Sequence, residues 1–522
     1  MVSSAALDAL ADPHRALIDL FDGELSSFPQ KVATHFSKLF STSLLDEIPV
    51  LDVARPPHRH ENNSIVRFRA MVQDTSLAHE MYLAKRSDGS CGGWGISDLD
   101  DVSIDVIDYA NLRERHVIWA VSIPGESRWC SSTTSEETGT TPLSSRPHKF
   151  PLPQTAHVGA QVKIYDVPPE AYKATDILEF FGILSSEPPT FAPTLHVLFS
   201  KVLPASLLPC HFPILDASYT NNLRHELISW IADEALAGDK GAAEWILLCA
   251  IARVQARHYA ILPPPMTLSR FPSPYSSSFS IPTISYVLAL IFPLLTTIPL
   301  SLPVLNNTSF YPQSNDEDLY SGWLQLPRGT ICMIAEGEVG EGEINGKALL
   351  NIRAVQEALD SQTLQYIFPY SSFTFETDLN FIILSDGRKS TFFQTYLNVP
   401  FQPVVNNITM DELKKKLYKP HDAISMPSKE KLEEFRQLVC GAKVGTSSIE
   451  QHVAQRIQED FIKERKSTIG CNLEPIGAID LMHRIMLARL YALSLHQPEV
   501  DIVVWEKVKI LDLDRKARIV HE

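Results

Sequence analysis

Two short, strongly apolar segments constrain the fold of this chain more than any other feature of its sequence. They lie at residues 330–334 and 379–384, and segments with helical periodicity lie at 244–256 and 348–359. A strand that is apolar on both faces belongs in a parallel sheet that helices cover on both sides. The sequence therefore predicts an α/β domain, which we place at residues 191–410.

The chain ahead of this domain alternates apolar and polar residues, as strands with a single buried face do. Within residues 65–74, Val66 and Phe68 alternate with Arg67 and Arg69, which is the period of a strand. Further strand-like segments lie at 116–121, 158–165 and 176–184.

The last of these segments contains Gly182, which suits the tight curvature of a small closed barrel. We expect residues 61–190 to form a barrel of the OB type, which has about five strands. Residues 130–147 are rich in Ser, Thr, Gly and Glu, and we expect them to be a disordered insertion in the barrel.

Both ends of the chain are expected to be helical, so the fold class is α/β and multidomain. Residues 1–60 carry an apolar face made by Leu7, Leu10, Leu17, Ile18 and Phe21. Residues 411–522 are expected to contain helices only. The last apolar stripe is made by Ile479, Met482, Ile485, Met486, Leu490 and Leu493, whose spacing predicts a core-facing helix.

Composition and charge exclude several classes of function. The chain has 46 Lys and Arg against 62 Asp and Glu, a net charge of −16. An acidic surface repels phosphate, so we expect no direct specific binding of nucleic acid. The seven cysteines are scattered without CxxC spacing, and the histidines lack metal-ligand periodicity, so neither a disulfide framework nor a metal site is expected.

A long stretch without charge, residues 271–315, invites a membrane-spanning interpretation. Pro293, Pro299 and Pro303 interrupt it, and no cluster of Lys and Arg flanks it. We therefore expect a broken helix followed by a buried strand, and no membrane association.

Residues 65–74 and 122–129, in this order, resemble the N-terminal part of the minichromosome maintenance (MCM) complex-binding protein family. The second segment ends the strand at 116–121 in a Pro-Gly turn. The resemblance extends over most of the chain and is strongest at 65–74, 119–129, 161–184 and 320–390. It implies a protein that resembles an MCM subunit, with an OB-like barrel, a degenerate AAA+-like domain and a C-terminal helical lid at 411–522.

Residues 238–245 resemble the phosphate loop of an MCM subunit without its chemistry. Gly238 and Gly241 match, but Glu244 stands where the phosphate-binding lysine belongs, and Trp245 replaces the hydroxyl that holds magnesium. A carboxylate at such range opposes phosphate by about 1 kcal/mol in water and by several times more when desolvated. Taken alone, the segment is equally well explained as a loop and the start of a helix that are unrelated to any nucleotide-binding site.

Other phosphate-handling positions have been lost as well. An apolar strand ends with Ala335 where a metal-binding aspartate belongs, and it keeps only Glu336. Ser385 and Asp386 stand where MCM subunits place an asparagine that senses the γ-phosphate. Ile479 replaces the phosphate-sensing arginine of the lid. One loss would fit a variant active site, whereas four indicate a protein that keeps the fold of the ATPase and has lost ATP hydrolysis.

We expect a non-catalytic binding protein or chaperone of MCM helicase subunits, with no cofactor, metal or catalytic residue. The resemblance implies a nuclear or nucleocytoplasmic protein that acts in the assembly, storage or unloading of MCM subunits during DNA replication, and that meets chromatin only indirectly. Two alternatives stay open. One is a nucleotide-dependent enzyme that uses Glu336 or Asp386, and the other is a single-strand DNA-binding protein that uses the barrel.

Overall fold

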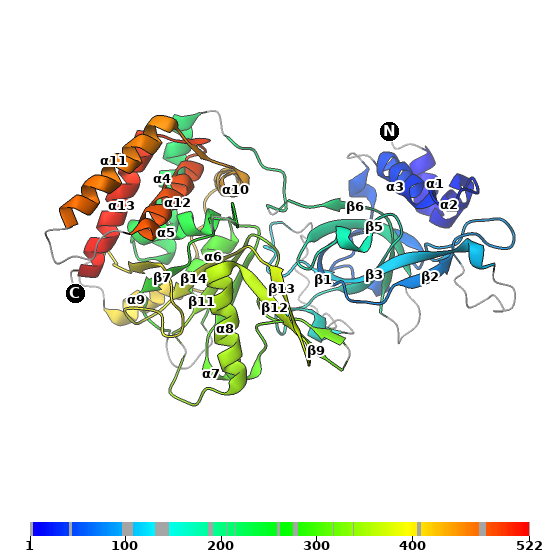
Figure 1. Cartoon of the computed structure of the whole chain (residues 1–522), viewed down its shortest axis with the longest axis horizontal. Helices are drawn as coiled ribbons and strands as arrows, with labels where there is room; N and C mark the ends of the chain where they lie inside the picture. The colour runs from blue at the N-terminus through cyan, green and yellow to red at the C-terminus, as the bar shows by residue number, and fades with distance from the viewer. Residues whose placement is uncertain are drawn as a thin grey trace.

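A barrel and a larger α/β body lie side by side along the long axis of the molecule (Figure 1). The computed structural model describes residues 4–40, 44–96, 108–130, 146–185, 192–204, 206–213, 216–257, 261–274, 280–316, 318–337, 339–404, 409–468 and 477–520. Most of the insertion expected at 130–147 therefore lies outside the described residues. The N-terminal helices and the C-terminal helices stand at opposite ends of the molecule.

Five strands close into a barrel, as the sequence predicts. They are β1 (Ser64–Asp74), β3 (Leu112–Ser122), β4 (Gly159–Ile164), β5 (Ile177–Ser185) and β6 (Thr194–Val202). The order around the barrel is β1-β3-β4-β6-β5 and back to β1, with β4 and β6 parallel and the other pairs antiparallel. A short strand, β2 (Glu80–Leu83), extends the sheet beside β3.

The predicted boundary between residues 190 and 191 is wrong. Strand β6 begins at Thr194, yet it pairs with β4 and β5 and completes the barrel. The alternating pattern of the barrel is confirmed, because Val66, Phe68 and Ala70 are fully buried in it. Gly182 allows a close approach, since a Cβ there would lie 2.5 Å from the carbonyl oxygen of His196, and the β5–β6 register shifts beside it.

The N-terminal helices share one hydrophobic core with the barrel. They are α1 (Ser4–Ala11), α2 (Pro13–Leu20) and α3 (Phe28–Leu39), and Leu17 and Phe36 pack in the same cluster as Phe181 of β5. The predicted apolar face is only partly correct, because Leu7 and Ile18 are exposed. Helix α3 supplies much of the apolar surface that those positions were expected to supply.

The body is built on a five-stranded parallel sheet. Its strands are β7 (Met266–Ser269), β8 (Leu295–Pro299), β11 (Thr330–Ala335), β14 (Leu379–Leu384) and β15 (Leu397–Pro400). Their spatial order is β15-β7-β14-β11-β8, and every pairing is parallel. The parallel sheet predicted from the apolar strands is thus confirmed.

Helices cover both faces of this sheet. Ile331 and Met333 of β11 belong to the core that includes α4 (Ala217–Ala235), α5 (Lys240–Ile251) and α6 (Thr283–Ala289). The alternate residues Cys332 and Ile334 belong to a second core with α7 (Leu302–Asn307) and α8 (Gly346–Ser361). The uncharged stretch supplies α6, β8 and α7 to this interior. Of the helices that the structure describes, none has the length and apolar character to cross a bilayer.

A small second sheet, which the sequence did not predict, lies next to α8. Its strands are β9 (Gln313–Asn315), β10 (Asp318–Tyr320), β12 (Thr363–Ile367) and β13 (Ser372–Glu376), in the order β10-β9-β12-β13. The strands β12 and β13 form an antiparallel hairpin.

The C-terminal region is mostly helical. It contains α9 (Met410–Leu417), α10 (Lys429–Val444), α11 (Gln451–Thr468), α12 (Ala478–Ser494) and α13 (Ile502–Val520). The expectation of helices only is wrong in one detail, because β16 (Ser448–Ile449) pairs with β17 (Glu499–Val500). The α12 stripe is buried from Met486 onward, whereas Ile479 and Met482 are exposed.

The turn after β3 joins the barrel to the body. Gly125 has φ +73°, and a Cβ there would lie 2.9 Å from the carbonyl oxygen of Leu295. Its own carbonyl accepts the N–H of Leu295 at 2.9 Å. Beside it, Ser127 Oγ donates to the carbonyl of Phe292 at 2.6 Å, and the Trp129 indole N–H donates to a carbonyl at the end of α6.

A buried ammonium group forms a second link between barrel and body. Lys149 is fully buried, and its Nζ lies 2.8 Å from Asp74 at the end of β1 and 2.6 Å from Asp318 of β10. Burial acts to raise the pKa of Asp318, but hydrogen bonds from Lys149 and His148 outweigh it and lower this pKa to about 2. One cation thus holds a carboxylate from each part of the molecule.

We predict that Lys149→Met destabilises the fold by about 3–5 kcal/mol, because it leaves Asp74 as an unpaired buried charge. Chemical denaturation at neutral pH measures this loss. The double variant Lys149→Met/Asp74→Asn should recover part of it, since it removes the stranded charge. A Lys149→Met protein as stable as the wild type would show that the ion pairs do not hold the junction.

A second buried lysine, Lys443 of α10, lies at the end of α5. Its ammonium group donates to the carbonyl of Ala250 at 2.9 Å and to Asn380 Oδ1 at 3.2 Å. Burial, only partly opposed by the carboxylate of Asp378, lowers the pKa of Lys443 to about 7. The folded protein therefore releases this proton far more easily than the unfolded chain, whose value is 10.5.

We predict that stability rises with pH above neutrality because of Lys443. Between the folded value and the unfolded value, the unfolded chain binds one proton more, so the free energy of unfolding increases by up to about 1.4 kcal/mol per pH unit. Below the folded value both states hold the proton and the effect is flat. Denaturation of the wild type and of Lys443→Met at pH of about 7, 8 and 9 tests this, and identical slopes for the two proteins would refute it.

Candidate functional site

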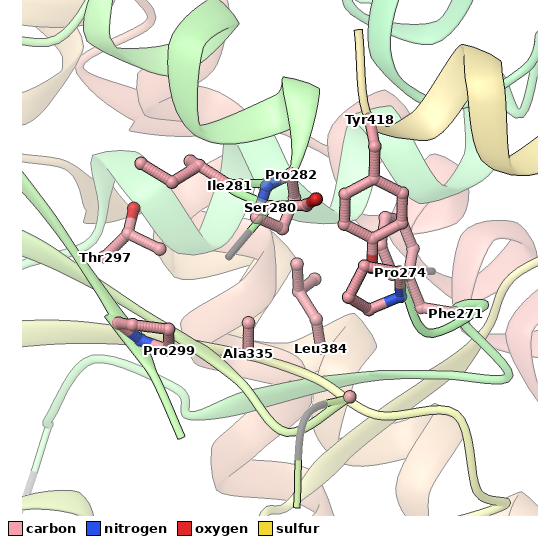
Figure 2. Close-up of a pocket in the computed structure, with 11 residues that line it drawn as sticks. Phe271, Pro274, Ser280, Ile281, Pro282, Thr297, Pro299, Ala335, Leu384 and Tyr418 are labelled. Carbon is pink, nitrogen blue, oxygen red and sulfur yellow. The ribbon is translucent and has the colours of Figure 1, made fainter. Parts of the chain in front are cut away.

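The most probable place for a ligand in a parallel sheet is the crevice where neighbouring strands connect in opposite directions. In this body that point lies between β7 and β14, because β7 leads to β8 at one edge of the sheet and β14 leads to β15 at the other. A cavity lies at the carboxyl ends of these strands (Figure 2). Its lining residues are Phe271, Pro274, Ser280, Ile281, Pro282, Thr297, Pro299, Ala335, Gly337, Leu384 and Tyr418.

This cavity is too small and too apolar for a nucleotide. Its free volume is about 10 Å³, roughly what a single water molecule needs. The lining residues that the structure describes carry no charged side chain. Pro282 precedes the first turn of α6 and, like Pro274, has no N–H to offer a phosphate.

The chain itself closes the crevice. Beyond the regular β7–β14 ladder, two further hydrogen bonds tie the chain after β7 to the chain after β14, since the N–H of Phe271 donates to the carbonyl of Ser385 at 2.8 Å and that of Arg270 to the carbonyl of Gly387 at 2.9 Å. Tyr418 lines the cavity, with its ring against Phe271 and its hydroxyl donating to the carbonyl of Pro272 at 2.9 Å. Among the residues that the structure describes, these bonds hold the ends of β7 and β14 together.

The degenerate acidic position expected at the end of β11 lies next to this cavity. Ala335 lines it, and Glu336 follows at the end of β11 with only 4% of its surface exposed. The Glu336 carboxylate accepts hydrogen bonds from the hydroxyl of Ser390 and from the N–H of Thr391 at 3.0 Å. It therefore anchors the loop after β14. Within the described ranges, no group of three or more His, Cys, Asp or Glu side chains could hold a metal ion.

The expected sensor residues of β14 also lie here. Ser385 is fully buried, and its hydroxyl donates to the carbonyl of Lys389 at 3.0 Å. Asp386 is exposed and accepts the hydroxyl of Ser273 at 2.6 Å. The structure thus brings Ala335, Glu336, Ser385 and Asp386 together at adjacent strand ends.

The predicted phosphate-loop position is wrong. A phosphate loop lies between a strand and a helix, whereas residues 238–245 are the end of the turn after α4 and the first half of α5, and they precede the first strand of the sheet. The segment that follows this strand is 270–282. Gly238 lies instead beside the chain that leaves β15, where the N–H of Val404 donates to the carbonyl of Ala237 at 3.2 Å.

The side chains of this segment serve helix packing. Asp239 caps α5 and binds Arg518 of α13 through two hydrogen bonds of 2.9 and 3.0 Å. Gly241 leaves room for the same guanidinium group. Glu244 is the partner of Arg224, a fully buried residue of α4, at 2.6 Å, and Trp245 is buried. Each residue that departs from the phosphate-loop pattern has a structural role in the body.

The expected lid position, Ile479, does not approach the cavity lining. It lies in the first turn of α12 and is 68% exposed. Tyr418 is the C-terminal residue that reaches the crevice. Sequence reasoning missed Tyr418 and residues 270–282. Strand β7 has only four residues, and the segment between β7 and α6 contains no glycine that would indicate a phosphate loop. The repeated prolines in that segment were the available clue.

Comparison with known proteins shows the family of this chain. The sequence pattern of the family described as "Mini-chromosome maintenance replisome factor" matches residues 36–146 and 186–519. The chain belongs to this family.

Several curated relatives carry the name mini-chromosome maintenance complex-binding protein. The protein from Gallus gallus is 24% identical over 95% of this chain and 94% of its own length. The Homo sapiens protein is 23% identical over 95% of both chains, and the Arabidopsis thaliana protein is 24% identical over 91% of both. The resemblance predicted from residues 65–74 and 122–129 is therefore confirmed.

These two segments meet at the junction of barrel and body. Arg69 of the first lies 3.1 Å from Glu126 of the second, and burial raises the pKa of Glu126. Arg69 also donates to the carbonyl of Cys130 at 2.8 Å. The residues that suggested this family thus fix the position of the barrel on the body.

We predict that Glu244→Lys, which restores the lysine of a phosphate loop, creates no ATP binding. It should instead destabilise the protein by about 3–5 kcal/mol, because the buried Arg224 loses its partner and faces a second cation. Thermal unfolding with and without ATP and magnesium measures both effects. Glu341→Lys, in an exposed loop, is the matched control and should be nearly neutral. An ATP-stabilised Glu244→Lys protein would contradict this assignment.

Proposed function

We propose that this chain binds subunits of the MCM complex and catalyses no reaction on nucleotide. The observation that carries the proposal is the family match, which covers parts of both barrel and body, together with relatives named for binding the mini-chromosome maintenance complex. The crevice supports the non-catalytic part. Small-molecule sites have volumes of about 300–1,000 Å³, against about 10 Å³ here.

The mechanism that we propose is mimicry of an MCM subunit by an AAA+-like body. Numbered along the chain, the strands of the parallel sheet have the order fifth, first, fourth, third, second, and the C-terminal helices pack beside them. Glu336 and Asp386 lie at the strand ends where an ATPase would hold magnesium and sense phosphate. Such a body would offer neighbouring subunits a familiar surface while supplying no competent ATP site.

We further propose that binding serves the assembly, storage or unloading of MCM subunits during DNA replication. The protein would act in the nucleus, with a cytoplasmic pool, and would meet chromatin through its MCM partners. Its net charge of −16 supports this role, because an acidic surface complements the basic, DNA-facing surfaces of a helicase.

The barrel gives little support to the DNA-binding alternative. Arg115 and Lys163 both contact Glu80, at 2.8 and 2.9 Å. Arg67 lies 3.6 Å from Glu179. Basic side chains that neutralise neighbouring carboxylates are not available to phosphates, so non-specific binding to single strands should be weak.

We predict that the purified chain forms a complex with purified MCM subunits in size-exclusion chromatography, and that millimolar ATP with magnesium leaves its unfolding temperature unchanged. A tagged chain should also recover MCM subunits from its own cells, identified by mass spectrometry. Recovery of a set that lacks one subunit would indicate whose place the chain takes. Failure to bind any subunit would refute the binding proposal, and stabilisation by ATP would refute its non-catalytic part.

A further inference from the structure

The hairpin of β12 and β13 leaves one edge of the small sheet open. At the opposite edge the chain after β10 is tied to the barrel, because the N–H of Ser321 donates to the carbonyl of His148 at 2.9 Å. Strand β13 is the last strand on its side among those that the structure describes (Figure 1). It contains none of the lysine, proline or bulge features that usually protect an edge strand.

The hydrogen-bond pattern shows which backbone groups face this open edge. The hairpin pairs Phe368 with Ser371 and Gln362 with Thr377 through N–H to carbonyl bonds of 2.9 and 2.8 Å. In an antiparallel ladder, bonded and non-bonded pairs alternate. Tyr366–Phe373 and Leu364–Phe375 are therefore bonded pairs, whereas the pairs of Ser372, Thr374 and Glu376 are not. These three residues direct their N–H and carbonyl groups outward.

The side chains of β13 continue an apolar row to the edge. Leu364 and Tyr366 of β12 are buried, and they lie opposite Phe375 and Phe373 on the same face of the sheet. Phe373 is 67% exposed, so the row ends at solvent. An added strand could extend the row with its own apolar side chains.

The other face of the hairpin is acidic. Glu357 of α8 accepts hydrogen bonds from Thr363 and Gln365 at 3.1 and 3.0 Å, and Glu376 lies on the same face, 3.3 Å from Arg257. Asp360 is exposed one helical turn after Glu357. These three carboxylates outnumber the nearby guanidinium groups of Arg257 and of Arg353, which lies one helical turn before Glu357, so this face favours basic side chains on an added strand.

We propose that β13 takes an extended segment of an MCM subunit as an added strand. The segment would alternate apolar side chains, placed beside Phe373, with basic side chains, placed toward Glu357. Main-chain hydrogen bonds to Thr374 and its outward neighbours would supply affinity, and the alternation would supply specificity. This inference rests on the proposed function, because it names the surface through which the MCM partner is held.

The charge of this edge favours such a partner over a second copy of the chain. Two β13 strands paired edge to edge would bring two sets of Glu357, Asp360 and Glu376 to one face. Like charges across neighbouring strands are destabilising. A basic segment removes this repulsion and a second copy doubles it.

The experiment compares binding of purified MCM subunits to the full-length wild type and to three variants. Thr374→Pro removes an outward N–H without touching the ladder to β12, and Phe373→Ser removes the exposed ring. Each should weaken binding about tenfold, the value of one backbone hydrogen bond or one apolar contact. Thr374→Val keeps the N–H and is the matched control, with unchanged affinity expected. Circular dichroism and unfolding temperature verify that each variant is folded. If Thr374→Pro does not fold, Phe373→Ser still tests the inference.

The possible failures are distinguishable. If the wild type binds and both variants bind equally well, the edge inference is overturned while the proposed function stands. If the wild type binds no MCM subunit, both are overturned. If the wild type is a dimer in solution and Thr374→Pro is a monomer, the edge belongs to a second copy and the inference is overturned.

Discussion

Burial of the parallel sheet on both faces is the constraint on which the rest of this structure depends. Alternate residues of β11 enter two different cores, with Ile331 on one side and Cys332 on the other. A sheet of this kind has no polar face to turn to water, so helices must cover it twice. The packing of α4–α6 with the C-terminal helices on one face, and of α7 and α8 on the other, follows from this requirement.

The crevice at the carboxyl ends of the sheet is lined mostly by apolar side chains. A ligand site needs the strands at a switch point to separate and to present polar groups. Here the N–H groups of Arg270 and Phe271 bind carbonyls of the chain after β14, and the rings of Phe271 and Tyr418 pack against each other beside the cavity. The Glu336 carboxylate holds the loop after β14 through Ser390 and Thr391. The contact between Phe271 and Tyr418 therefore adds apolar packing at the point of the sheet where a ligand site would need a hydrated cleft.

Periodicity predicted the parts of the fold that local pattern determines. The alternation around Phe68 indicated a barrel strand, and the apolar runs at β11 and β14 indicated a parallel sheet. A strand with one buried face alternates apolar and polar residues, whereas a strand buried on both faces is apolar throughout. Strand β6 was assigned to the wrong part, because pairing partners depend on tertiary contacts. The residues at 238–245 have the spacing of a phosphate loop, but only the fold shows that Glu244 forms an ion pair with Arg224. Strand β7 was too short to be recognised, and with it the true position of the crevice.

Sequence could also not reveal that the barrel and the body are joined by buried polar contacts. The ammonium of Lys149, the carbonyl of Gly125 and the hydroxyl of Ser127 each bind groups from the other part. Rigid coupling of this kind fixes the distance between surfaces on the barrel and surfaces on the body. A partner that touches both would meet them already in register and would lose little conformational entropy on binding. A fixed distance between barrel and body therefore favours partners whose two contact sites are separated by the same distance.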